Sequence, residues 1–161
     1  MNVALDVRNE SRHKRLYTRP SLQRLAERVC AGEGVVDDVA LSVLFCDDAF
    51  IRKLNRQFRD VDAATDVLSF SQQNESALAE RTLGDVVISL DTVYRRTKGD
   101  RDRMRAELRL LFCHGMLHLL GHDHATEATR RAMADKQAAY LDLSPEAAWI
   151  AEPGLHAAAK V

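Results

Sequence analysis

The sequence has no long hydrophobic run and no strong excess of charge of one sign. No stretch approaches the ~18 consecutive apolar residues of a membrane-spanning helix, so we expect no membrane segment. Lysine and arginine total 23 against 24 aspartate and glutamate, which gives a formal net charge of −1. A uniformly basic nucleic-acid-binding protein is therefore excluded. Any surface that binds RNA must be a local patch.

Cysteine is also scarce. The three cysteines, Cys30, Cys46 and Cys113, are widely spaced and form no C-x-x-C pair. This is typical of reduced thiols rather than of a disulfide framework, and we expect Cys113 to be a core residue. The N-terminal stretch MNVALDVRNESRHKR carries charges where a secretory signal needs an unbroken apolar run. We therefore expect a soluble, cytoplasmic protein.

The chain shows no internal repeat, linker or low-complexity segment. Its 161 residues, 46% hydrophobic and 29% charged, are enough for one globular domain with its own core. We expect a single domain over residues 1–161, with a loose tail from about residue 142, where no strong pattern remains.

Hydrophobic periodicity predicts four strands and five helices. Strands are expected where β-branched and apolar residues alternate or cluster, over residues 3–7, 39–46, 65–71 and 84–90. Helices are expected where apolar residues recur at helical spacing, over residues 20–32, 47–58, 91–98, 101–120 and 125–141. This order indicates an α+β fold with a roughly four-stranded mixed sheet packed by about five helices.

Four of the six histidines fall in one short stretch, HGMLHLLGHDH. His114 and His118 are four residues apart, so they share a helix face at about 5–6 Å between Cβ atoms. That separation allows both imidazoles to bind one zinc ion. On a continued helix, His122 would lie about 12 Å along the axis from His114, too far to share the ion.

Gly121 changes this geometry, because glycine readily adopts the left-handed conformation that ends a helix. Beyond such a turn, a third histidine can approach the ion from the side. The predicted metal ligands are therefore His114, His118 and His124. His122 and Asp123 are expected as neighbours, and Asp123 could orient a ligand imidazole. Zinc is the expected metal, with another imidazole-binding ion such as nickel as the alternative.

The histidine stretch differs from the zinc-protease pattern H-E-x-x-H-x-x-G-x-x-H at one fixed position. Gly115 replaces the glutamate that serves as general base in those enzymes. Three histidines with an open fourth position still favour hydrolytic chemistry over a closed structural site. The histidine-bearing helix is thus zincin-like, but peptide hydrolysis by the usual route is not expected. The isolated His13 and His156 are expected to be plain surface residues.

The stretch HGMLHLLGHDH resembles the signature of the YbeY family, bacterial single-domain metal-dependent endoribonucleases that act in ribosomal RNA maturation. Two other stretches agree with this resemblance. LNRQFRDVDAATDVLSFS resembles the family's L-N-x3-R block followed by T-D/N-V-L-S-F-P, and LGDVVIS resembles L-G-D-I/V-x-I-S. Ser71 departs from the family's proline, at a place that affects loop stiffness rather than chemistry.

The resemblance implies a zinc-dependent, single-strand-specific endoribonuclease acting in ribosomal RNA maturation and ribosome quality control. It implies ribosomal RNA as substrate and ribosomal or ribosome-assembly proteins as partners, with no membrane and no DNA specificity. It also implies that Arg59 binds the scissile phosphate and stabilises the transition state, a role that suits a planar guanidinium. Without the resemblance, an exposed helix-end arginine is the expected interpretation of Arg59.

The residues alone leave alternatives open. The protein could be a zinc metalloprotease-like hydrolase that lacks the usual glutamate, or a non-catalytic RNA-binding ribosome-assembly factor. Asp85 and Asp66 are candidate general bases, and each is equally expected to bond backbone at a strand end. Glu107 lies two turns before His114 on the same helix face, and is either a neighbour of the site or solvated.

Overall fold

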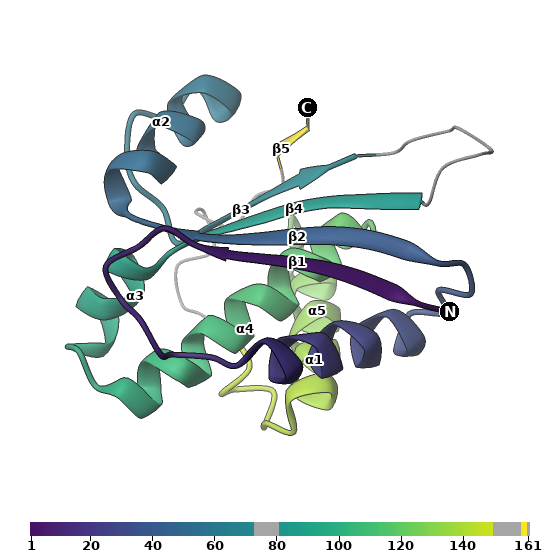
Figure 1. The fold of residues 1–161 in the computed structure, drawn as a ribbon. Coiled ribbons are helices and arrows are strands. Elements are labelled where there is room, and N and C mark those ends of the chain that lie inside the picture. The colour runs from purple at the N-terminus through teal and green to yellow at the C-terminus, as the bar shows by residue number, and fades with distance from the viewer. Residues whose placement is uncertain (73–80, 150–158, 161) are drawn as a thin grey trace.

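The computed structural model describes residues 1–72, 81–149 and 159–160. The fold is a mixed sheet with helices on both faces (Figure 1). The strands are β1 (Val3–Asn9), β2 (Val39–Cys46), β3 (Val67–Ser71), β4 (Arg81–Ser89) and β5 (Ala159–Lys160). The helices are α1 (Arg19–Gly32), α2 (Asp48–Arg59), α3 (Leu90–Thr97), α4 (Arg101–Leu119) and α5 (Glu127–Leu141).

The sheet has the strand order β1-β2-β4-β3-β5. β1, β2 and β4 run parallel, and β3 runs antiparallel to β4. The two-residue β5 pairs with β3 at residues 70 and 71. The predicted α+β fold with a roughly four-stranded mixed sheet and about five helices is therefore confirmed, with β5 as a short addition at one edge.

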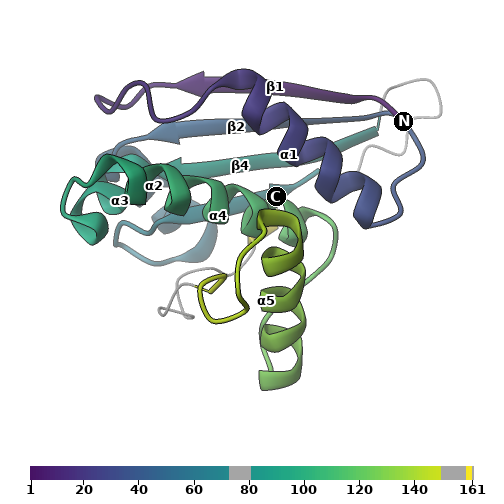
Figure 2. The ribbon, with the colours of Figure 1, turned by 90° about the horizontal axis from the view of Figure 1, so that it is seen from below.

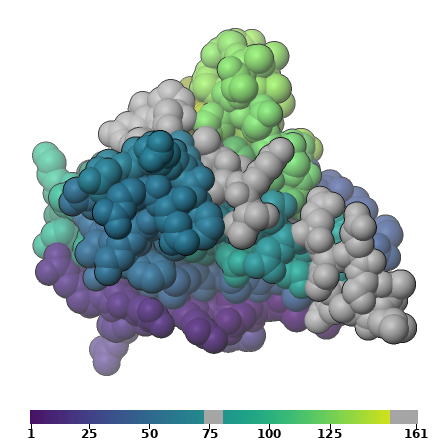
Figure 3. All heavy atoms as spheres, turned by 90° about the horizontal axis from the view of Figure 1, so that it is seen from above, coloured from purple at the N-terminus to yellow at the C-terminus, as the bar shows by residue number. Residues whose placement is uncertain are grey.

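The helices form two unequal layers. α2 lies on one face of the sheet, whereas α1, α4 and α5 lie on the other face (Figures 1 and 2). Figure 3 looks onto the first face and shows α2 over one end of it. The larger hydrophobic core fills the space between the sheet and the α1–α4 layer, and a smaller cluster packs under α2.

Side-chain caps explain several element boundaries. Asp47 Oδ1 accepts a hydrogen bond from Phe50 N at 2.8 Å and starts α2, and Asp100 caps α4 in the same way. Gly121 has φ +98°, as expected for the turn that ends α4. Gly121 N donates to His118 O and His122 N donates to Leu117 O, both at 3.0 Å, which is the Schellman arrangement.

The predicted boundaries lie within three residues of the observed ones, and β2 matches its predicted range. Of the tail expected to be loose from about residue 142, residues 150–158 and 161 lie outside the described residues. Just before them, Ala148 is fully buried. None of the helices in the described ranges is long and apolar enough to cross a membrane.

Candidate metal centre

Three imidazoles converge where α4 ends. His114 and His118 come from the last turns of α4, and His124 follows the turn at Gly121. One ring nitrogen from each histidine lies within 4.8 Å of the others. Nε2 of His114 and Nε2 of His118 are 3.0 Å apart. Two nitrogens bound to a tetrahedral zinc at about 2.0–2.1 Å lie roughly 3.3 Å from each other, so the spacing suits one ion.

The hydrogen bonds of the first two histidines fix their tautomers. His114 Nδ1 lies 2.8 Å from Gln137 Oε1, and His118 Nδ1 lies 2.9 Å from the carbonyl oxygen of His122. Gln137 is itself oriented, because its NH2 group donates to the carbonyl oxygen of Ala148. Both partners of the histidines are acceptors, so each Nδ1 carries the proton and each Nε2 presents a lone pair.

This arrangement fits a bound cation. His114 and His118 are buried, with 4% and 7% exposure, and with their protons on Nδ1 neither Nε2 donates to the other. Two lone pairs that face each other at this distance repel unless a positive ion lies between them. Three imidazole nitrogens are a donor set that suits zinc or nickel. The three histidines would hold such an ion, as their spacing in the sequence predicted.

Trp149 packs against the same site. Its ring centroid lies 5.5 Å from that of His114 and 5.4 Å from that of His124, both in edge-to-face geometry. The guanidinium carbon of Arg130 lies 5.6 Å from the indole centroid, within reach of a cation–π interaction. The sequence analysis missed Trp149 and Gln137. The only signal for Trp149 was its being the single tryptophan of the chain.

His122 and Asp123 have other partners. His122 Nε2 contacts Glu33, which also accepts hydrogen bonds from Lys136 and Tyr140. Asp123 Oδ1 lies 3.3 Å from Ala125 N. The orienting role expected of Asp123 is thus taken by Gln137 for one imidazole and by the His122 carbonyl for another.

Glu33 ties the turn after α4 to the ends of α1 and α5. Its side chain is only 7% exposed, and burial alone would raise its pKa. The hydrogen bonds from Tyr140, Lys136 and His122 outweigh burial and lower the pKa to about 2. Glu33 is therefore an ionised carboxylate that holds the backbone segment leading to His124.

Gly115 faces the sheet rather than open space. A Cβ atom at this position would lie 2.6 Å from Val86 Cγ1 and 3.1 Å from Ser69 Oγ. Ser69 Oγ also donates to the carbonyl oxygen of Gly115 at 3.1 Å. The position that carries a glutamate in the zinc proteases is closely packed here against β3 and β4, which leaves no room for a glutamate side chain.

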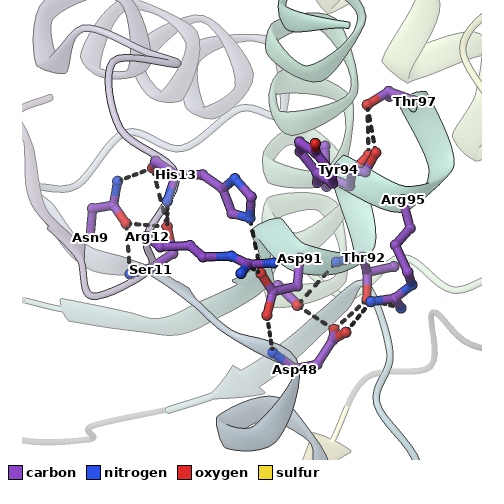
Figure 4. Close-up of polar contacts among 12 residues, drawn as sticks. Asn9, Ser11, Arg12, His13, Asp48, Asp91, Thr92, Tyr94, Arg95 and Thr97 are labelled. Atoms are coloured by element: carbon purple, nitrogen blue, oxygen red, sulfur yellow. Dashed lines mark hydrogen bonds and ion pairs between the residues drawn. The ribbon is translucent and has the colours of Figure 1, made fainter. Parts of the chain in front are cut away.

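A polar network fixes the N-terminal end of α2 (Figure 4). Asp91 Oδ2 accepts from Asp48 N at 3.1 Å, and the Asp48 carboxylate accepts from Thr92 Oγ1 at 2.7 Å and from Arg95. His13 joins the network, with Nε2 2.9 Å from Asp91 Oδ1. The expectation of a plain surface residue was wrong for His13, whose side chain is 12% exposed. His156 lies outside the described residues.

Arg59 is the last residue of α2. Its Nη1 lies 3.4 Å from Asn55 Oδ1. The preceding Phe58 packs edge-to-face on Phe70 of β3, at 5.1 Å between centroids. The adjacent Ser69 points to the other side, toward α4. The end of α2 and the histidine-bearing helix therefore flank the same strand.

The two candidate bases occupy different places. Asp85 lines a cavity of about 530 Å³ between α2 and the sheet, and it accepts hydrogen bonds from Ser42 and Gln72. It therefore lies on the sheet face opposite α4. Asp66 is fully buried and accepts from Val67 N at 2.7 Å and from Arg96 Nη1 at 3.0 Å. The structure does not bring Asp85 to the three histidines.

Comparison with known proteins places this arrangement in a family. The sequence profile described as "Endoribonuclease YbeY" matches residues 6–144. The chain belongs to the YbeY family. The resemblance seen in the histidine stretch is thereby confirmed over most of the chain. Ala148 and Trp149, which surround the candidate metal centre, lie beyond the matched range.

Individual relatives agree. The chain is 45% identical to Endoribonuclease YbeY of Pelotomaculum thermopropionicum over 120 residues, 72% of this chain and 79% of that protein. It is 53% identical to Endoribonuclease YbeY of Anaeromyxobacter dehalogenans over 102 residues, 63% of this chain and 52% of that longer protein. The solution structure of TM1509 from Thermotoga maritima superposes with a TM-score of 0.55 at 26% identity, covering 90% of this chain and 89% of that one.

Proposed function

We propose that this protein is a zinc-dependent endoribonuclease that cleaves single-stranded ribosomal RNA in its maturation and in ribosome quality control. The observation that carries this proposal is the buried group of three imidazoles with nitrogens within 4.8 Å of one another. The names of the relatives, Endoribonuclease YbeY, support RNA as the substrate. A cytoplasmic location and ribosomal or ribosome-assembly partners belong to the same proposal.

Each residue at the site has a defined task in this proposal. His114, His118 and His124 would hold the metal, which supplies a Lewis acid beside the scissile phosphate when bound. Gln137 and the His122 carbonyl keep the first two imidazoles in the binding tautomer.

Arg59 would bind the non-bridging phosphate oxygens from the far side of β3, where its planar fork can pair two of them. Negative charge that develops on those oxygens is then stabilised by a fixed cation. The protease alternative is disfavoured, because position 115 packs on the sheet and leaves no room for the missing glutamate.

The test compares metal content and RNA cleavage in the same preparations. Wild-type protein is stripped with a chelator, reloaded with zinc and incubated with an end-labelled single-stranded ribosomal RNA fragment and a matched duplex. We expect metal-dependent cleavage of the single strand only. His118→Ala should lose both zinc, measured by elemental analysis, and cleavage.

His122→Ala is the matched control, because it removes a histidine of the same stretch that contacts Glu33 rather than the other three histidines. It should keep its zinc. Arg59→Glu should keep zinc and lose cleavage. RNA left intact by fully zinc-loaded wild type would favour a non-catalytic assembly factor instead. Cleavage that persists undiminished in His118→Ala would contradict the assigned metal centre.

A further inference from the structure

Glu107 is a buried carboxylate with hydrogen-bonding capacity left over. Its side chain is 12% exposed, and Oε1 lies 3.2 Å from Arg96 Nη1. Oε2 is buried without a hydrogen-bond partner. A buried acceptor without a donor costs about 1–3 kcal/mol, so this position favours a ligand that brings an N–H group.

A pocket of about 420 Å³ borders this carboxylate. This volume falls in the range of small-ligand sites, roughly 300–1,000 Å³. Its walls combine an aromatic ring, cations, a carboxylate and apolar side chains, and they include Arg96, Arg103, Glu107, Leu110, Leu143 and Trp149. An aromatic surface with nearby cations and one acceptor is the kind of environment in which proteins hold an unstacked RNA base.

The pocket adjoins the candidate metal centre. Trp149 is a wall of the pocket and also packs against His114 and His124. Glu107 lies two turns before His114 on the same face of α4, which places the two Cα atoms about 10 Å apart along the axis. That separation corresponds to one or two nucleotides of an extended strand.

We propose that this pocket binds a guanine base of the RNA strand, close to the bond that lies at the three histidines. The inference rests on the proposed function, because it names a subsite for that substrate. Guanine presents two donors side by side, N1–H and the N2 amino group, which match a carboxylate. Adenine and cytosine place an acceptor beside their amino group, and uracil flanks its single donor with two carbonyl oxygens.

The protein side of this recognition needs only a small movement. The terminal torsion of a glutamate is soft, so the Glu107 carboxylate can turn an oxygen toward the pocket while it stays bonded to Arg96. The indole of Trp149 supplies an aromatic wall, and the exposed Arg103 supplies positive charge for the backbone of the same nucleotide.

The test measures nucleoside binding without cleavage. Because Trp149 is the only tryptophan, its fluorescence reports on this pocket alone. The full-length, zinc-loaded protein is titrated with guanosine, adenosine, cytidine and uridine, which lack the phosphate that would seek the metal. We expect guanosine to bind at least about fivefold more tightly than the others, the lower limit for a bidentate contact.

Glu107→Gln should remove this preference, whereas the exposed Glu27→Gln is the matched control and should keep it. Should Glu107→Gln fail to fold, Ala147→Phe tests the same pocket from its exposed rim and should abolish binding. Equal responses to the four nucleosides, or a guanosine preference that survives Glu107→Gln or Ala147→Phe, would overturn the inference.

The result is separable from the proposed function. RNA that stays intact while guanosine still binds through Glu107 would overturn the endoribonuclease activity and support the subsite. Cleavage by wild type with no difference among the nucleosides would support the activity and overturn the subsite.

Discussion

Gln137 Oε1 lies 2.8 Å from His114 Nδ1, across 23 positions of sequence. The same amide donates to the carbonyl oxygen of Ala148, so its orientation is fixed from both ends. The first histidine of the metal centre is therefore held by α5 and by the segment that follows it. In this way the packing of α5 on α4 determines which nitrogen faces the other two imidazoles.

Replacement of this amide should weaken metal binding without removing a ligand. We expect Gln137→Leu to lower zinc affinity 10- to 100-fold, the usual range for loss of a partner of a ligating histidine. Competition with a chromophoric chelator gives the affinity directly. Gln57→Leu, on the exposed side of α2, should leave zinc affinity unchanged. Equal affinity in Gln137→Leu and wild type would show that the bond to His114 does not orient the ring.

A methyl group at position 115 should destabilise the protein. Alanine is favoured over glycine by about 1 kcal/mol within a helix, yet its Cβ would lie 2.6 Å from Val86 Cγ1. Overpacking of this kind typically costs about 1–3 kcal/mol, and Gly115→Glu should be worse. Urea unfolding measures both variants. A Gly115→Ala protein more stable than wild type would show that β4 yields easily to α4.

Glu33 should make stability depend on acid pH. Its pKa falls from 4.5 to about 2 on folding, so the stabilisation is complete above 4.5 and is lost as pH falls toward 2. The effect amounts to about 3 kcal/mol at most. The difference in unfolding free energy between wild type and Glu33→Gln should therefore shrink from about pH 6 to about pH 3. Glu27→Gln should show no such trend, and a pH-independent difference for Glu33→Gln would contradict this role.

The thiols should be inert in the folded protein. Cys30, Cys46 and Cys113 are all buried. Burial raises the pKa of Cys30 to about 11 and that of Cys46 to about 12. We expect no rapid labelling by a thiol-specific reagent in native buffer, and labelling of all three after denaturation. Fast modification of a single cysteine in native protein would indicate local opening of the core.

The elements and the three histidines could be predicted because their signals are local. β2 is a run of apolar, largely β-branched residues, and its predicted range matched the observed one. His114 and His118 are related by helical spacing, and the φ of Gly121 confirms the turn that brings His124 back. Such patterns depend on neighbours within a few positions.

The surroundings of the site could not be predicted in the same way. His13 reaches Asp91 across 78 positions, and Glu33 reaches His122 across 89. No periodicity connects residues that far apart. Trp149 lies in a stretch without a pattern, and its packing on the histidines depends on the path of the chain after α5.

The position of Ala148 and Trp149 has a practical consequence. The motifs that define the family end before these two residues, yet a carbonyl and an indole from this short stretch brace the imidazoles. A fragment trimmed to the shared motifs would keep every ligand and still hold its ion less firmly. The smallest unit that binds metal at full strength is therefore longer than the smallest unit that can be recognised.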